Sequence, residues 1–306
     1  MKTKLSSLFI VLLLIADVPF LLAQPTTNIT TAGMAFIPAG AFTMGNSIGD
    51  SDITNATTVS VNLSAFYMDI NLVSLSQWQS VYFWATNHGY WFSNVGSGKG
   101  ANYPVQRVNW YDAIKWSNAR SQQAGLTPTY YKDASLTKPY MTGEGGIMPV
   151  YVNWAANGYR LPTEAEWEKA ARGGLNGQRF PWGNTISLSQ ANYYGHTNLF
   201  TYDLGPNGHN VIFEAGGFPY TSPVGYFASN GYGLNDMVGN VFEWCWDRYG
   251  TPYEGGNDPH GPANGDFRVL RGGYWSYAAP SLRCAYRTFY RPILPLNYGF
   301  RCVKGR

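Results

Sequence analysis

Hydrophobic and polar residues recur along this chain with two different periods, and each period predicts one kind of element. Residues 34–45, MAFIPAGAFTMG, alternate apolar and small side chains around Pro and Gly, which predicts a short strand and a turn. Residues 64–86 open on a strand-like piece and continue with a helical repeat of apolar side chains, at Trp78, Val81, Tyr82 and Ala85. We expect Ser76 to cap this helix.

Two further helices are predicted downstream. In VNWYDAIKWSNARSQQAG the apolar repeat places Trp110, Ala113, Ile114 and Ser117 on one face, and Gly125 is positioned to end the helix. In YRLPTEAEWEKAARGG, Thr163 and Glu166 have the spacing of a capping box, and Gly173 with Gly174 stops the helix.

The remaining stretches predict loops and a single domain. Residues 126–153 and 175–235 are rich in turn-forming residues and have no long apolar period. The chain contains neither a linker-like segment nor a tandem repeat, so we assign residues 33–304 to one domain.

The N-terminus predicts export. Lys2 and Lys4 precede the apolar run LFIVLLLIA, and small residues lead up to Gln24, which is the pattern of a cleavable secretory signal over residues 1–23. Asp17 and Pro19 interrupt the apolar stretch, so it is short for a membrane span, although an uncleaved anchor is the alternative. Residues 24–32 then form a flexible leader. We expect a secreted or periplasmic protein with no transmembrane segment after cleavage.

Composition narrows the partners. The formal net charge is +3 and only 13% of residues are charged, which argues against a nucleic-acid partner. The high content of Gly (35) and Tyr (23) is typical of a compact fold with many loops. Three cysteines allow at most one disulfide, and the four histidines lack metal-ligand spacing.

The segment from Tyr274 to Tyr298 is unusual because it is aromatic and contains no Asp, Glu, Lys or Gln. Core packing, a catalytic loop and a binding surface are the three interpretations open to it. Tyrosine-rich surfaces of low charge suit recognition, because Tyr offers a large area and a hydroxyl with little rotamer entropy to lose.

Several blocks occur in a fixed order: IPAGAFTMG, FYMD, YRLPTEAEWEKAARGG, FPWGN, NGYGLNDMVGNVFEWCWDRY, RVLRGG and GFRC. Together they resemble the formylglycine-generating enzyme family, also called sulfatase-modifying factor domains, over residues 33–303. The resemblance implies an α+β fold akin to the C-type lectin, a single domain with two main helices, short strands and long loops.

The same resemblance implies structural calcium. Its ligands would be the side chains of Asp236 and Glu243 with the carbonyls of Gly239 and Val241, and calcium readily accepts such mixed oxygen donors. A turn with two solvated acids is the alternative. A second family site would use Asn192 and Tyr193, with Glu214 replacing an acid that is missing near Gly216.

This sequence departs from the family at the residues that carry out its chemistry. Enzymes of the family oxidise a substrate cysteine with two cysteines that bind copper(I), and thiolates are the ligands which that ion prefers. Here the interval YWSYAAPSL has no Cys, and Tyr277 stands where the first thiol would be. We therefore do not expect copper. An iron-dependent branch of the superfamily uses clustered histidines, which this chain also lacks.

The cysteines that are present resemble structural positions of the family. Cys284 and Cys302 match disulfide-forming cysteines whose partners fall near Ala171 and Ser117, so whether they pair with each other or stay as thiols is open. Cys245 matches no family role and is interpreted as a small buried hydrophobe.

The segment also resembles the C-terminal hypervariable region of variable proteins of diversity-generating retroelements. There, randomised adenines in AAC codons allow only amino acids with codons ending in C. The residues of 274–298 that lie outside the family's framework positions, here called the free side chains, satisfy that limit. We predict a non-catalytic domain that binds an extracellular protein or glycan through residues 274–298, with an unspecialised scaffold and a formylglycine-generating oxidase as alternatives. The predicted ligand-binding residues are Tyr274, Ser276, Tyr277, Tyr286, Phe289, Tyr290, Arg291, Asn297 and Tyr298.

Overall fold

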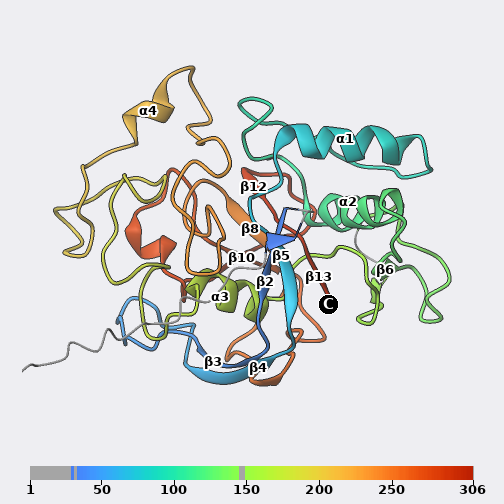
Figure 1. Ribbon diagram of the computed structural model, residues 1–306, viewed down its shortest axis with the longest axis horizontal. Helices are drawn as coiled ribbons and strands as arrows, with labels where there is room; N and C mark the ends of the chain where they lie inside the picture. The colour runs from blue at the N-terminus through green and yellow to red at the C-terminus, as the bar shows by residue number, and fades with distance from the viewer. Residues whose placement is uncertain (1–28, 31–32, 145–148, 306) are drawn as a thin grey trace, which may run out of the picture.

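Two long helices and several small sheets make up the protein, with extended loops on the side away from the helices (Figure 1). The computed structural model describes residues 29–30, 33–144 and 149–305, so the predicted signal and most of the leader lie outside the described residues. Within those ranges no helix combines the length and apolar character needed to cross a membrane.

The cap of the first helix lies two residues earlier than predicted. Helix α1 spans Leu75–Thr86, and the Ser74 hydroxyl accepts a hydrogen bond from the backbone N–H of Gln77 at 3.2 Å. The prediction of Ser76 as the cap is therefore wrong. The two serines flank an apolar residue, and Ser74 is the one whose extended backbone lets its side chain turn back onto the first turn.

The other two predicted helices are confirmed, and so is the predicted capping box of α3. Helix α2 spans Trp110–Gln123 and starts with a capping box between Asn109 and Asp112. Helix α3 spans Glu164–Arg172 and has the predicted capping box between Thr163 and Glu166. It ends at Gly173, whose φ of 58° is the left-handed conformation that glycine adopts without strain. A fourth helix, α4 (Val211–Glu214), is a single turn on a projecting loop.

Within the described ranges the strands form four small sheets, as expected of a mixed α+β fold. The first has the order β1-β2-β5-β13, with strands Ile29–Thr30, Met34–Ile37, Phe66–Asp69 and Val303–Gly305. The second has the order β11-β10-β8-β12, with strands Thr288–Tyr290, Arg268–Arg271, Phe242–Arg248 and Tyr298–Gly299. The third and fourth, β3-β4-β9 and β6-β7, are made of Gly40–Met44, Val59–Leu63, Gly256–Asn257, Tyr130–Tyr131 and Tyr151–Val152.

Aromatic side chains hold these pieces together. The fully buried tryptophans come from both long helices, from α3 and from β8, at positions Trp78, Trp110, Trp116, Trp167 and Trp244. The rings of Trp78 and Trp116 are stacked with centroids 5.9 Å apart, and each meets the ring of Phe300 edge-on. The core therefore joins α1 and α2 directly to the C-terminal end of the chain.

The three cysteines are buried and unbonded. Cys302 Sγ lies 3.4 Å from the hydroxyl of Ser117, the position implied for its missing partner. Cys284 packs in a different cluster that includes Ala171. Cys284 and Cys302 therefore do not pair, and burial raises the pKa of each thiol to about 12.

Candidate ligand-binding face

The aromatic segment is held at both ends by one sheet. After β10 the chain makes a 3₁₀ turn at Ala279–Leu282 and returns as β11, which pairs antiparallel with β10. Residues 291–297 then lead to β12, which pairs in parallel with β8. Residues 274–298 therefore form a loop system whose ends cannot move independently, which suits a preorganised binding surface.

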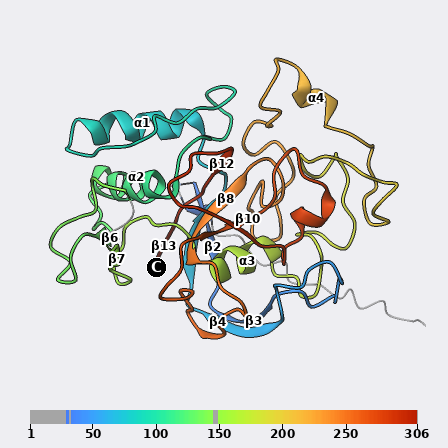
Figure 2. The same ribbon diagram turned by 180° about the vertical axis from the view of Figure 1, so that it is seen from behind.

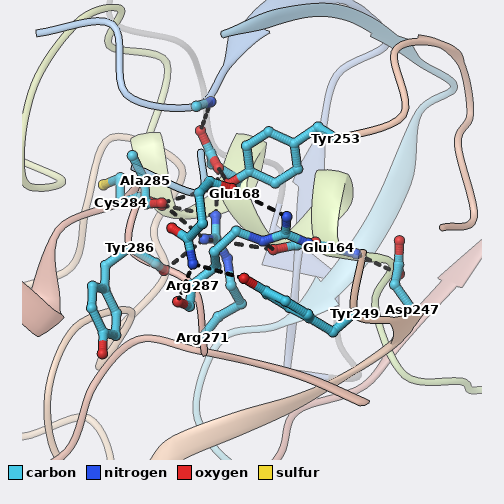
Figure 3. A network of polar contacts seen from close by, with 12 residues as sticks. Glu164, Glu168, Asp247, Tyr249, Tyr253, Arg271, Cys284, Ala285, Tyr286 and Arg287 are labelled. Atoms are coloured by element: carbon cyan, nitrogen blue, oxygen red, sulfur yellow. Dashed lines mark hydrogen bonds and ion pairs between the residues drawn. The ribbon is translucent and has the colours of Figure 1, made fainter. Parts of the chain in front are cut away.

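Beneath this segment lies a buried ionic network (Figure 3). Glu168, fully buried on α3, accepts hydrogen bonds from the backbone N–H of Gly45 at 2.7 Å and from Arg172 at 2.7 and 3.0 Å, and it also pairs with Arg271. Glu164 accepts two hydrogen bonds from Arg287, at 2.8 and 2.5 Å. Burial alone would raise the pKa of Glu168, but Arg172 and Arg271 hold it below its usual value.

The network also fixes the backbone of the segment. Arg271 donates to the carbonyls of Cys284, Ala285 and Tyr286, at 2.9, 3.3 and 2.6 Å. Asp247 differs from the other acids, because it accepts the Glu164 backbone N–H at 2.7 Å and forms no ion pair among the described residues. Burial and the neighbouring Glu164 raise its pKa well above the ordinary value.

Four of the predicted ligand-binding tyrosines gather on one side of the segment. Tyr274 and Tyr277 have ring centroids 5.0 Å apart, Tyr290 and Tyr298 are 5.5 Å apart, and both pairs border the ring of Phe242 through Tyr277 and Tyr298. Tyr277 is 43% exposed. Within the described ranges, no hydrogen bond is made by the hydroxyls of Tyr274, Tyr277, Tyr286, Tyr290 and Tyr298.

Neighbouring hydroxyls affect one another here. Burial, followed by the proximity of Tyr286, Tyr274 and Tyr290, raises the pKa of Tyr277. The rings of Tyr274 and Tyr277 lie side by side, as do those of Tyr290 and Tyr298, and their hydroxyls make no hydrogen bond among the described residues. We call the four tyrosines Tyr274, Tyr277, Tyr290 and Tyr298 the aromatic face.

Phe289 and Arg291 are not part of this face. Phe289 precedes Tyr290 on β11, and successive strand residues point to opposite sides. Its ring contacts Tyr249 at 4.2 Å and Phe267 at 4.9 Å, and the Arg291 guanidinium lies 5.9 Å from the ring of Phe267. The expectation of a single surface containing all nine predicted residues is therefore wrong, because the period of the strand divides them.

A cleft of about 290 Å³ is lined by residues from both ends of the segment. Trp275 and Asn297 from the segment line it, together with Gln106, Arg107, Phe218 and Pro219. Gln106 is only 2% exposed, and both polar atoms of its side chain lack a partner among the described residues. The indole N–H of Trp275 is also buried without a partner there. Asn297 is half-buried and is the predicted residue that reaches this cleft.

Comparison with known proteins identifies the family. The model of the sulfatase-modifying factor enzyme 1-like domain matches residues 19–306. The chain belongs to this family. It is 33% identical to the chaperone protein LppX of Paenibacillus barcinonensis, over 97% of this chain and 99% of that protein. It is 32% identical to the formylglycine-generating enzyme of Mus musculus, over 94% and 79% respectively.

Solved structures confirm the predicted fold. Treponema denticola variable protein 1 matches with a TM-score of 0.68 and 28% identity, over 89% of this chain and 95% of that chain. The fold is the C-type-lectin-like α+β fold of the formylglycine-generating enzyme family, as the ordered sequence blocks implied.

The cysteines of this family member do not fit a copper(I) site. All three are buried in the core, Cys245 in strand β8, Cys284 within residues 274–298 and Cys302 just after them, and burial raises the pKa of each. Copper(I) requires accessible thiolates. At the position that the resemblance assigns to the first copper thiol stands the half-exposed phenol of Tyr277.

The residues assigned to calcium fit it in part. Asp236 is 7% exposed, its Oδ2 accepts from Gly225 at 2.6 Å, and its Oδ1 has no partner among the described residues. Burial raises the pKa of Asp236 to about 6. Glu243 is fully buried and receives two hydrogen bonds from Arg301, at 2.8 and 3.0 Å. Arg301 also donates to the backbone carbonyl of Asp236, at 3.3 Å, so its ion pair is with Glu243. Both acids are buried, and the alternative of two solvated acids is wrong.

The second calcium assignment has less support in the geometry. The backbone of Asn192 pairs with that of Gly239, so Asn192 lies beside the first set of ligands. The hydroxyl of Tyr193 instead donates to Asp203 at 2.5 Å. Glu214 is exposed on α4, and within the described ranges no interaction joins its carboxylate to Asn192 or Tyr193.

Sequence reasoning missed Gln106, Arg107 and Phe218. They come from segments far from the aromatic segment in sequence, and none belongs to a motif. Only the unusual run Gln106-Arg107 between two apolar residues, just before a predicted helix, could have drawn attention to them.

Proposed function

We propose that this chain is a non-catalytic, ligand-binding member of the sulfatase-modifying factor family, exported from the cell, which binds an extracellular protein or glycan through the aromatic face. The observation that carries this proposal is the group of neighbouring tyrosine rings, whose hydroxyls have no partners among the described residues, at the position where the family's enzymes carry a copper thiol. Tyrosines of this kind supply the anchors that dominate many interfaces.

The relatives support a binding role as much as an enzymatic one. One relative that matches over nearly its whole length is named a chaperone, and one structural neighbour is named a variable protein. The formylglycine-generating enzymes in the same family favour the alternative, a thiol oxidase. Against that alternative, the three thiols of this chain are buried apart from one another and apart from the aromatic face.

The test of binding removes two anchors together. Tyr277→Ala with Tyr290→Ala is expected to weaken ligand binding by at least about 2 kcal/mol, because buried aromatic anchors dominate interfaces. Tyr226→Ala is the matched control, since Tyr226 is 51% exposed and lies outside the face. Equal affinities for the control and the double variant, measured against a ligand captured from extracellular material, would contradict the proposal.

The test of catalysis is independent of the ligand. The purified protein, loaded with copper and given a cysteine-containing sulfatase peptide, is expected to leave the peptide thiol unchanged by mass spectrometry. Formation of an aldehyde would restore the oxidase alternative.

We further propose that the segment is diversified, because each free side chain in it belongs to a residue type with a codon ending in C. A near-copy of the codons for residues 274–298 beside the gene, differing where the copy has adenine, together with a reverse-transcriptase gene, is the expected result. Without them the binding surface would be a fixed one.

Calcium is proposed as a structural ion. Asp236 and Glu243 would supply carboxylate oxygens, and Gly239 and Val241 would supply carbonyls. The support is the burial of both acidic side chains and the orphan Oδ1 of Asp236. A carboxylate oxygen has two lone pairs, so Glu243 can serve a cation while it is paired with Arg301.

A further inference from the structure

The cleft beside the aromatic face contains polar groups that the scaffold does not use. Gln106 presents one amide donor pair and one carbonyl acceptor, and neither has a partner among the described residues. Leaving such a group buried and unpaired costs on the order of 1–3 kcal/mol. A cost of this size at a position with no scaffold role points to a ligand.

The backbone around Gln106 and Arg107 is fixed in place. Gln106 exchanges two backbone hydrogen bonds with Ser97, at 2.6 and 2.8 Å, and the Arg107 N–H donates to Leu296 at 2.9 Å. Arg107 has a φ of 56°, a left-handed conformation that is rare and strained for a side chain of this size. The two neighbouring loops therefore hold these side chains at the cleft, at a cost in backbone strain.

The charge of the cleft is one-sided. Arg107 is exposed, and its guanidinium makes no ion pair or hydrogen bond among the described residues. No carboxylate lines the cleft, whereas the donors include Arg107, the Gln106 amide and the Trp275 indole. The complementary ligand carries an anion and several hydroxyl or carbonyl oxygens.

Aromatic rings supply the apolar side of the cleft. Phe218 is 73% exposed, and its ring centroid lies 5.6 Å from that of Trp275. The volume, about 290 Å³, is at the lower end of the roughly 300–1,000 Å³ typical of small-molecule sites. One ring with its substituents fits such a volume better than a length of polypeptide.

We infer that the cleft binds a carboxylate-bearing sugar, a uronic acid unit, as the specific anchor of a glycan whose remainder lies on the aromatic face. This inference rests on the proposed binding function. The carboxylate pairs with Arg107, two adjacent hydroxyls pair with the donor and the acceptor of Gln106, and the apolar face of the sugar ring lies against Phe218. The lining has no pair of carboxylates, which is the arrangement that most glycoside hydrolases use.

The test titrates the full chain with methyl β-D-glucuronide and tetragalacturonate, with methyl β-D-glucoside as the neutral match and acetyl-Ala-Asp-Ala-amide as the acidic peptide. Nuclear magnetic resonance of side-chain N–H groups reports binding, because the Trp275 indole signal shifts when it gains an acceptor. We expect saturable shifts with both uronides and affinities at least about tenfold weaker for the glucoside and the peptide, since hydrogen bonds to charged groups are the stronger ones.

Variants assign the binding to the cleft. Arg107→Gln is expected to lower uronide affinity about tenfold. The control Arg291→Gln, which removes an exposed arginine outside the cleft, should change it less than about twofold. Gln106→Leu should abolish uronide binding without lowering the melting temperature, because it removes a buried amide that has no partner in the scaffold.

Several outcomes overturn the inference. They are peptide binding without uronide binding, no binding of either uronide, and a lower melting temperature for Gln106→Leu with uronide affinity unchanged. The double variant Tyr277→Ala with Tyr290→Ala should keep its affinity for methyl β-D-glucuronide, because neither tyrosine lines the cleft. If the double variant loses this affinity, the sugar binds at the aromatic face. The inference about the cleft is then wrong, and the proposed binding function stands. Aldehyde formation in the oxidase assay would instead overturn the proposed function while cleft binding is still measurable.

Discussion

The ionic network under β10 and the ligand-binding face above it differ in how completely their polar groups are paired. In the network, both carboxylate oxygens of Glu164 and of Glu168 accept hydrogen bonds (Figure 3). The buried Nε of Arg271 is an exception, because it has no partner among the described residues. On the face, the tyrosine hydroxyls and the Gln106 amide have no partners among the described residues. Arg271 and Tyr274 are only three residues apart. Residues that support the fold and residues available for binding are therefore close neighbours in the sequence.

The largest expected effect comes from breaking the network. Glu168→Leu leaves Arg172 and Arg271 buried without their shared acid, which should lower the free energy of unfolding by about 3–5 kcal/mol. Glu254→Leu is the control, because Glu254 is exposed, and it should change stability by less than about 0.5 kcal/mol. Urea unfolding measures both. Similar values for the two variants would mean that the network does not support the segment.

A second prediction concerns the calcium site at Asp236. Among the described residues, this acid has a buried carboxylate oxygen without a partner, as the groups of the face have free hydroxyls. Chelation should lower the melting temperature, since an ion at about 100 times its Kd stabilises the folded state by about 2.7 kcal/mol. Asp236→Asn should lose most of this sensitivity to chelator, and Asp266→Asn, an exposed acid, should keep it. A wild-type melting curve that ignores both calcium and chelator would refute the site.

Asp247 provides a pH test within the network. Its pKa in the folded protein is raised above the ordinary 3.8 by burial and by Glu164. Protonated Asp247 contributes its full stability at a pH below the ordinary pKa of 3.8. This contribution is lost as the pH rises through the higher pKa of the folded protein. Asp247→Asn, whose amide oxygen can still accept the Glu164 N–H, should therefore gain stability over wild type as pH rises from about 4. A difference between the two proteins that stays constant from pH 4 to 8 would contradict the raised pKa.

The smallest effect is expected on the face itself. Tyr298→Phe should change the free energy of unfolding by less than about 0.5 kcal/mol, because its hydroxyl has no partner among the described residues. Tyr130→Phe should cost about 1–2 kcal/mol, because the Tyr130 hydroxyl accepts from the buried Leu161 N–H at 2.8 Å. Equal losses in thermal unfolding would mean that the face is part of the scaffold.

The sequence by itself determined the helices α1, α2 and α3, the cap of α3 and the family. The Thr163–Glu166 box and the Gly173 stop act within one or two turns of backbone, so their effect is local and can be predicted. The error at the start of α1, Ser76 in place of Ser74, arose because both serines satisfy the same local rule. The aromatic segment could also be recognised, because its composition is a property of contiguous residues.

Only the tertiary structure decided how these residues divide into sites. The strand period of β11 separated Phe289 from Tyr290, and the path of the loops placed Gln106 and Arg107 beside Trp275. Whether a buried polar group finds a partner depends on segments that are distant in sequence. Glu168 pairs with Arg271, whereas the Gln106 amide has no partner among the described residues. Such pairing depends on the geometry of the whole chain, so no local pattern of residues encodes it.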